Sequence, residues 1–156
     1  MKSDPLITFR RKPATLDCQS LHSFAEVLRN RVARKRDFHC LITNDAELQA
    51  LNARFRGKDY ATDVLSFPSE GPATDAEESA ADERFLGDIA ISIQRARAQA
   101  REWQHPAEEE IRILLLHGVL HLLGMDHETD SGEMKRTETR WRRKLGLPVG
   151  LIEREA

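Results

Sequence analysis

Three histidines lie close together in the segment HGVLHLLGMDH: His117, His121 and His127. His117 and His121 are four residues apart, so on a helix they project from one face with Cβ atoms about 5–6 Å apart. Gly124 offers a left-handed position at which such a helix can end and the chain can turn back. We therefore expect His127 to reach the same point in space, where the three imidazoles form a metal site.

Three imidazole nitrogens are a ligand set of catalytic zinc sites, in which a water molecule takes the fourth position. Zinc lowers the pKa of that water towards neutrality, so hydroxide becomes available for hydrolysis. The spacing equals that of the zinc-peptidase motif H-E-x-x-H-x-x-G-x-x-H, except that Gly118 stands in place of the general-base glutamate. The motif predicts a hydrolytic site with one zinc ion per chain and without the usual base.

Two simpler interpretations of the histidines stay open. The three residues are compatible with ordinary histidines that happen to align on a core helix. They are also compatible with a closed structural zinc, which needs a fourth protein ligand. Cys40 and Asp126 are the only suggestive candidates for that ligand. An open water position would indicate an enzyme, whereas four protein ligands would indicate a structural site.

The composition fits a single compact domain over residues 1–156, with 40% hydrophobic and 32% charged residues. Cys18 and Cys40 show neither metal-type spacing nor the pattern of a secreted disulfide framework, which favours a reducing compartment, the cytoplasm. The first ten residues contain no long apolar stretch, and histidines interrupt the richest apolar run, Ile113–Leu123. We therefore expect neither a signal peptide nor a membrane span.

The net charge of -2 hides an asymmetry along the chain. Residues 1–58 carry 12 Lys and Arg against 6 Asp and Glu, whereas residues 59–110 carry 4 against 13. A basic face of this kind is able to follow a phosphate backbone, but a solvated helix flank explains it equally well. The residues concerned are Arg29, Arg31, Arg34, Lys35 and Arg36.

The predicted fold class is α+β, because short strands mingle with helical segments without regular alternation. Apolar, strand-type runs occur at Leu6–Arg10, Phe38–Thr43, Val64–Phe67 and Ile89–Ile91. They predict a small mixed sheet of about four strands, covered by helices. The acidic, Ala-rich segment Ser69–Arg84 between the last two runs is expected to be a mobile loop of undetermined role.

Five helices are expected from apolar residues at helical spacing. Their markers are Leu21, Phe24, Leu28 and Val32; Leu48, Leu51 and Phe55; Ala96, Ala100 and Trp103; the buried metal helix Pro106–Leu123, with Glu108, Glu109 and Glu110 in its first turn; and Met134, Trp141 and Leu145. Expected caps are Asn44 with Glu47, Ser92, and Asp130 with Glu133, and Gly57 is expected to end the second helix.

A second informative stretch is RFRGKDYATDVLSFP, followed later by LGDIAIS. Arg54, Arg56 and Lys58 precede a predicted strand, so they are either delivered to a site at the end of the sheet or exposed to solvent. Arg56 offers a planar donor fork suited to two phosphate oxygens. Asp63 and Asp88 are candidates either for orienting the metal-binding histidines or for capping local turns.

FRGKDYATDVLSFP, LGDIAIS and HGVLHLLGMDH, in this order along the chain, resemble the YbeY family of bacterial zinc-dependent endoribonucleases. The resemblance runs from about Asn44 to His127, and that family also carries glycine after the first histidine, as at Gly118. It implies action on ribosomal RNA, in maturation of the 3′ end of 16S rRNA and in ribosome quality control, with the ribosome or its proteins as partners. It further implies zinc on His117, His121 and His127, and an essential arginine at Arg56.

The mechanism suggested by the residues and the resemblance is cleavage of single-stranded RNA, whose backbone can be drawn into a pocket. Zinc would activate water or polarise the phosphate while Arg56 neutralises developing charge. The base stays open between a phosphate oxygen, zinc-bound hydroxide and a carboxylate such as Asp63. Two rivals are a metallopeptidase or other small-substrate zinc hydrolase, which Gly118 disfavours, and a ribosome-associated binding factor with a structural zinc. The sequence leaves the oligomeric state undetermined.

Overall fold

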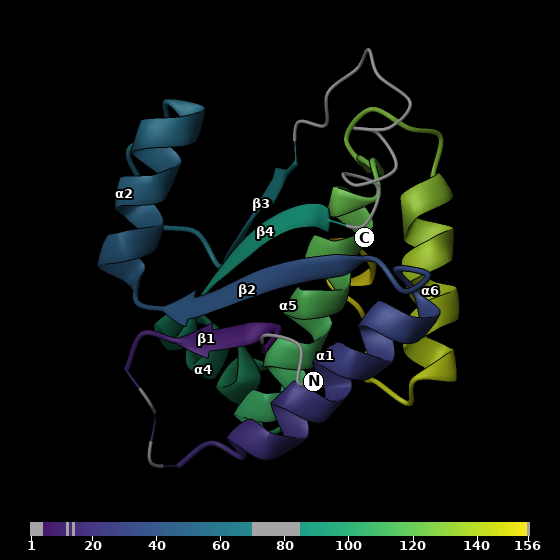
Figure 1. The fold of residues 1–156 in the computed structure, drawn as a ribbon, viewed down its shortest axis with the longest axis horizontal. Coiled ribbons are helices and arrows are strands. Elements are labelled where there is room, and N and C mark those ends of the chain that lie inside the picture. The colour runs from purple at the N-terminus through teal and green to yellow at the C-terminus, as the bar shows by residue number, and fades with distance from the viewer. Residues whose placement is uncertain (1–4, 12, 14, 70–84, 156) are drawn as a thin grey trace.

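The computed structural model describes residues 5–11, 13, 15–69 and 85–155, which form one four-stranded sheet with helices packed around it (Figure 1). The strands are β1 (Ile7–Phe9), β2 (Asp37–Thr43), β3 (Val64–Pro68) and β4 (Phe85–Ser92). The helices are α1 (Cys18–Arg31), α2 (Asp45–Arg56), α4 (Ile93–Glu102), α5 (Ala107–Leu122) and α6 (Glu133–Lys144), and a 3-10 turn η1 (Glu153–Glu155) follows. The predicted loop 69–84 lies, except for Ser69, outside the described residues.

The sheet is mixed, with strand order β1-β2-β4-β3. β1 and β2 are parallel, and so are β2 and β4, with Cys40 paired to Ile89. β3 runs antiparallel to β4 and places Ser66 beside the same Ile89. The prediction of an α+β fold with a small mixed sheet is therefore confirmed, although β4 extends well beyond the predicted run Ile89–Ile91.

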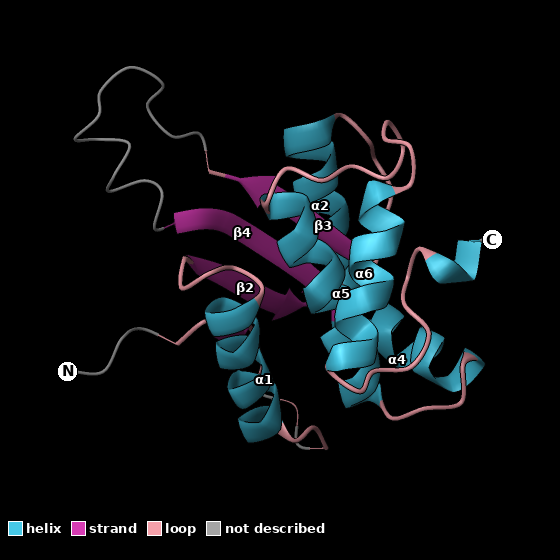
Figure 2. Cartoon of the chain, turned by 90° about the vertical axis from the view of Figure 1, so that its right-hand side faces the viewer, coloured by secondary structure: helices cyan, strands magenta, loops and turns pink. Residues whose placement is uncertain are grey.

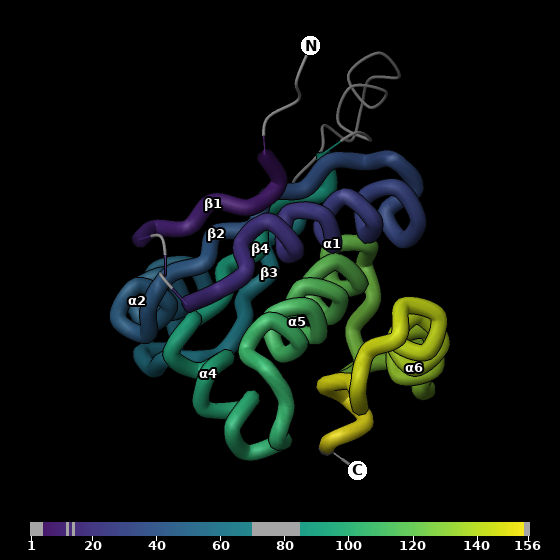
Figure 3. The backbone as a smooth tube through the Cα atoms, turned by 90° about the horizontal axis from the view of Figure 1, so that it is seen from below, coloured from purple at the N-terminus to yellow at the C-terminus, as the bar shows by residue number. Residues whose placement is uncertain are grey.

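The two faces of the sheet differ because side chains alternate along each strand. On β2 and β4, Cys40, Ile42, Ile89 and Ile91 join the main core with α1, α5 and α6. Ala90, next to Ile91, instead contributes to a smaller cluster with residues of α2. Figures 2 and 3 show α5 and α6 side by side, with α5 between the strands and α6 in Figure 3, and Figure 1 shows α2 on the far side from α6.

Helix α5 is the buried centre of the molecule, as its nearly uniform apolar composition predicts. It follows Pro106, and its first turn carries three glutamates, which suits the positive end of the helix dipole. One of these glutamates, Glu110, also forms a buried ion pair. Glu110 is fully buried, and its carboxylate accepts hydrogen bonds from both terminal guanidinium nitrogens of Arg154 at 2.8 Å.

Several predicted helix caps are present, with changes in detail. Asn44 accepts a hydrogen bond from the Glu47 backbone N–H, but the Glu47 carboxylate binds Arg10 and Thr43 instead of completing a capping box. Ser92 caps α4 through the Arg95 N–H. Gly57 ends α2 in the left-handed conformation, as predicted. The N-cap of α6 is Gly132, and the carboxylate of Asp130 accepts hydrogen bonds from the Gly132 and Met134 N–H groups.

Two residues predicted to lie on apolar helix faces are exposed. Phe55, near the end of α2, is 57% exposed, although its ring contacts that of Phe67 on β3, with the ring centroids 5.5 Å apart. Trp103 follows the last turn of α4 and is 42% exposed, with the Arg154 guanidinium over its ring. In the part of the chain that the structure describes, no helix has the length and apolar character needed to span a membrane.

Candidate metal centre

The structure brings the three predicted histidines together at the end of α5. His117 and His121 lie on one face of the helix, with their Nε2 atoms 3.1 Å apart. The helix ends at Leu122, Gly124 adopts a positive φ of 94°, and the chain turns back so that His127 faces both rings. One ligand nitrogen from each residue lies within 4.8 Å of the others.

The rings of His117 and His121 are held in place through their other nitrogens. His117 is 5% exposed, and its Nδ1–H donates to the Glu138 carboxylate of α6 at 2.7 Å. The His121 Nδ1–H donates to the Met125 carbonyl oxygen at 2.9 Å. Because a carbonyl only accepts hydrogen bonds and a carboxylate normally does so, each neutral ring carries its proton on Nδ1 and leaves the Nε2 lone pair directed inward.

This donor set fits a borderline-soft divalent cation such as zinc. Two neutral imidazole lone pairs 3.1 Å apart repel one another when no proton or cation lies between them. Burial lowers the pKa of His121, and the neighbouring His117 ring lowers it further, so the neutral, ligating form of the ring is favoured. An outer partner on the Nδ1–H of a ligating histidine is the usual arrangement in zinc sites.

Glu138 was missed by the sequence analysis, although a signal for it exists. Met134, Glu138, Trp141 and Leu145 recur at helical spacing, and the first, third and fourth were predicted to be buried. A glutamate within such an apolar row is rare unless it is paired. Here Glu138 is 1% exposed, and its second oxygen accepts from the Ile152 backbone N–H at 2.8 Å.

Gly118 faces the sheet and not the histidine pocket. A Cβ atom at this position would lie 3.0 Å from two side-chain carbons of Ile89, which is tighter than ordinary packing. The position that carries glutamate in zinc peptidases is thus pressed against β4, where no carboxylate fits. This geometry explains the absence of the peptidase base and counts against a peptidase activity.

Arg56 lies in the same pocket as the three histidines. The pocket has a volume of about 440 Å³ and is lined also by Lys58, Ser66, Asp126 and Glu128, among others. The Arg56 guanidinium donates to the Ser66 carbonyl oxygen and lies 5.8 Å from the centre of the Phe67 ring. The end of α2 therefore contributes a cation to this pocket, which is one of the two alternatives that the sequence left open for Arg56.

The remaining candidates lie elsewhere or have other roles. Arg54 is exposed and lies over Phe55, outside the pocket lining. The Asp63 carboxylate accepts from the Val64 N–H and from the Gln99 side chain, so it caps the start of β3 beside the metal pocket. Asp88 lies 3.7 Å from His39 in a cavity with α2 residues, on the other face of the sheet, which excludes it as a partner of the histidines.

A closed, four-ligand site is not formed by the described residues, in which only the three histidines cluster as potential ligands. Cys40 is fully buried in the core, where burial raises the pKa of its thiol, and it is not part of this cluster. Asp126 lines the pocket, but its carboxylate caps the turn through the Glu128 N–H at 3.0 Å. The arrangement is that of an open three-histidine centre, the class of metal-dependent hydrolases.

Comparison with known proteins agrees with this class. The family model described as Endoribonuclease YbeY matches residues 7–146, and the chain belongs to this family of endoribonucleases. The Endoribonuclease YbeY of Solibacter usitatus (strain Ellin6076) is 60% identical over 148 residues, which are 95% of this chain and 92% of the relative. That of Koribacter versatilis (strain Ellin345) is 46% identical over 149 residues, 96% and 91% of the two chains.

A solved structure also shares the fold. The solution structure of TM1509 from Thermotoga maritima superposes with a TM-score of 0.56 at 25% sequence identity. The match covers 86% of this chain and 85% of that protein. The resemblance deduced from the histidine, FRGKD and LGDIAIS segments is therefore confirmed over almost the whole chain.

Proposed function

We propose that the protein is a zinc-dependent endoribonuclease that cleaves single-stranded segments of ribosomal RNA. The observation that carries the proposal is the pocket shared by three convergent imidazole nitrogens and the Arg56 guanidinium. A cation site beside an arginine suits a phosphodiester, whose transition state gathers negative charge on oxygen. Family membership supplies the RNA substrate and the hydrolytic reaction.

In this proposal His117, His121 and His127 hold one zinc ion, and the chain's other residues orient the reactants. Zinc, when bound there, supplies an activated water and polarises a phosphoryl oxygen. Glu138 and the Met125 carbonyl fix the tautomers of two ligands. Arg56, held by the Ser66 carbonyl, directs its remaining N–H groups at the phosphate and neutralises developing charge.

The biological setting extends the same proposal. We infer that the chain acts as one catalytic unit over residues 1–156, on the 3′ end of 16S rRNA and in ribosome quality control, in contact with the ribosome. The family match over residues 7–146 and the shared core support one unit. Cytoplasmic action accords with the two free cysteines, Cys18 and Cys40.

The test compares His121→Ala with His39→Ala, a control on the other face of the sheet. Removal of His121 leaves an incomplete ligand shell, so bound zinc should fall from one equivalent to nearly none, and cleavage of a single-stranded RNA should be abolished. The control should keep both. Zinc is measured by elemental analysis of purified protein, and cleavage is measured on 16S rRNA 3′-end fragments in single-stranded and base-paired form.

Two results would contradict the proposal. One full equivalent of zinc in the His121→Ala protein would place the ligands elsewhere. Zinc-loaded wild-type protein that leaves every RNA intact would refute the catalytic function and favour a binding factor.

A further inference from the structure

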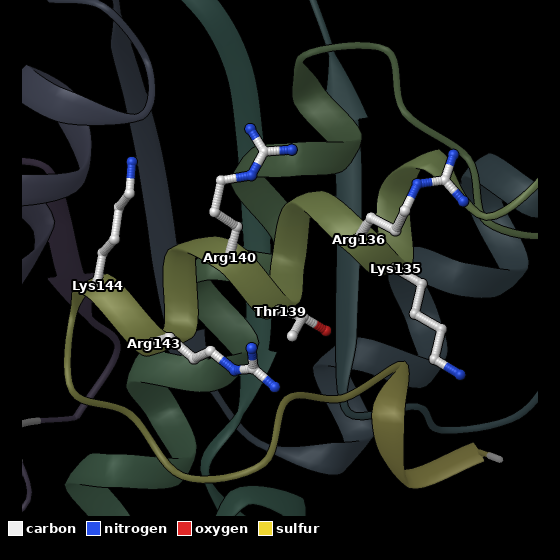
Figure 4. A pocket seen from close by; sticks show the side chains of 6 residues that line it. All are labelled: Lys135, Arg136, Thr139, Arg140, Arg143 and Lys144. Atoms are coloured by element: carbon white, nitrogen blue, oxygen red, sulfur yellow. The ribbon is translucent and has the colours of Figure 1, made fainter.

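The outer face of α6 carries a dense set of cations that the metal centre does not use. Figure 4 shows Arg136, Arg140 and Lys144 extending from one side of the helix, and Lys135 and Arg143 from the other. With Thr139 they line a hollow of about 440 Å³. These five cations, Lys135, Arg136, Arg140, Arg143 and Lys144, are called the α6 cationic face below.

The α6 cationic face is only slightly neutralised by the described carboxylates, of which Asp130 interacts electrostatically with Arg136. Arg142, its neighbour, forms a two-bond pair with Glu153, which lowers the pKa of that carboxyl to about 2. The five cations of the face have no ion pair with a described carboxylate. Like charges four residues apart on a helix, as in Arg136 and Arg140, destabilise it by about 0.2–0.5 kcal/mol per pair. Glu133 in the first turn of the helix and Asp130 before it offset only part of this repulsion.

The helix dipole explains only part of this charge. Arg143 and Lys144 lie in the last turn of α6, where cations are favourable. Lys135 and Arg136 lie in the first turn, where the same dipole disfavours a positive charge. Glu133 and Asp130 reduce this unfavourable energy at the amino-terminal half of the face, and an anionic partner would reduce it further.

Cations from α1 extend this face. The Arg31 guanidinium lies 5.7 Å from the centre of the Trp141 ring, and the Lys144 ammonium lies 5.1 Å from the same ring. The turn after α1 then exposes Arg34 and Lys35, both with positive φ. The basic amino-terminal segment noted in the sequence is thus continuous with α6 through the shared indole ring of Trp141.

We propose that the α6 cationic face, extended by Arg31, binds the sugar–phosphate backbone of the RNA substrate outside the metal pocket. Lys135 and Lys144 are nine residues apart, roughly 14 Å along the helix, which matches about four phosphates of one strand. The inner side of α6 holds His117 through Glu138, so the face lies about one helix diameter, ~10 Å, from the metal ligands.

The bound segment is therefore not the one that is cleaved. A base-paired region fits the face, because duplex RNA is recognised mainly through its phosphates and shape. The adjoining single strand then passes round the turn before α6 into the pocket. This inference rests on the proposed function and adds a second contact that selects RNA in which a paired segment flanks the cleavage site.

The test uses the triple variant Lys135→Gln/Arg136→Gln/Arg140→Gln, which spares the last turn of the helix. The control, Arg11→Gln/Arg97→Gln/Arg101→Gln, removes the same charge from the segment after β1 and from α4. Affinity for an RNA hairpin with a single-stranded tail is measured in EDTA at several salt concentrations. The α6 variant should bind about tenfold or more weakly, and its salt slope should fall by roughly 2 to 3. The control should bind like the wild type.

Cleavage gives a second measurement, with zinc restored. The α6 variant should lose about tenfold in kcat/KM on the tailed hairpin, mainly through KM, and should cleave a five-nucleotide single strand like the wild type. Unchanged affinity and salt slope, or an equal loss in the control, would overturn the inference. The inference would also be overturned if the α6 variant bound RNA normally but lost affinity for an acidic ribosomal protein, because the face would then bind a protein partner. Wild-type protein that binds the hairpin through α6 but cleaves nothing would refute only the proposed function.

Discussion

At the scale of single residues, each ring nitrogen of His117 has a defined partner. Nε2 faces His121 and Nδ1 donates to Glu138, which is itself anchored by the Ile152 N–H. Only the ligand atom belongs to the motif that the sequence displays. The orientation of that atom depends on α6 and on the chain beyond it, through a contact between residues 21 positions apart.

The first prediction concerns Glu138→Gln. The amide keeps the size of the side chain and can still accept a hydrogen bond, but it loses the negative charge that raises the basicity of the His117 ligand atom. Zinc affinity should fall by about 10- to 100-fold, as measured by competition with a chelator. Glu133→Gln, at an exposed position of the same helix, is the control. Equal affinities of all three proteins would show that Glu138 has only a packing role.

The second prediction concerns Arg56, whose guanidinium shares the pocket with the histidines. If it stabilises charge in the transition state, Arg56→Ala should lower the RNA cleavage rate by roughly ten- to a thousandfold with zinc content and folding retained. Arg56→Lys should recover only part of the rate, because an ammonium lacks the paired donors. Arg54→Ala, two residues away and outside the pocket, should cleave normally. A fully active, well-folded Arg56→Ala protein would remove this residue from the mechanism.

At the scale of elements, the approach of α5 to β4 determines where the histidines can lie. Gly118 is in contact with Ile89, and its carbonyl oxygen accepts from the Ser66 hydroxyl at 3.2 Å. Ser66 in turn holds Arg56 through its backbone carbonyl. The close packing of one helix on one sheet thus sets the separation between the Arg56 guanidinium and the three histidines.

The third prediction tests this packing with Gly118→Ala. The new methyl group meets Ile89 at 3.0 Å, so the helix or the strand must shift, and we expect a loss of about 1–3 kcal/mol in unfolding free energy despite the better helix propensity of alanine. Ile89→Val alone should cost about 0.5–1.5 kcal/mol. The double variant should lose less unfolding free energy than the sum of the two single losses, as measured by urea denaturation. Simple additivity would show that the contact is not strained.

The sequence predicts elements well where periodicity is local and poorly where contacts are distant. Helix α5 runs over Ala107–Leu122, close to the predicted Pro106–Leu123, and Leu21 and Leu28 of the apolar row predicted for α1 are buried, because burial follows directly from such patterns. The exposed fraction of Phe55 and the length of β4 depend on how far the neighbouring elements extend, which the local sequence does not show. The apolar row around Glu138 indicates that this residue is buried, but its pairing with His117 and the position of Asp88 beside His39 depend on contacts between residues far apart in the sequence.

At the scale of the whole molecule, the carboxyl-terminal segment holds α4, α5 and α6 together. Glu110 on α5 binds Arg154 through two hydrogen bonds and His105 through a third at 2.7 Å, and Arg154 also covers Trp103 after α4. The Arg142–Glu153 pair attaches the same segment to α6. The family match ends at residue 146, so Glu153 and Arg154 make these contacts from beyond the matched region, whereas their partners lie within it.

The last prediction is that Arg154→Ala destabilises the entire fold and not only the chain end. Glu110 is fully buried, and without the guanidinium its carboxylate keeps only His105 as a partner, which should cost about 3–5 kcal/mol. Glu110→Gln/Arg154→Met removes both charges and should recover most of that stability, because no unpaired charge then remains buried. Arg140→Ala, an exposed arginine, should change stability by less than about 0.5 kcal/mol. Urea unfolding followed by both far-ultraviolet circular dichroism and tryptophan fluorescence measures these differences. A loss below 1 kcal/mol in Arg154→Ala, or a fluorescence change that precedes global unfolding, would show that the segment is a local attachment.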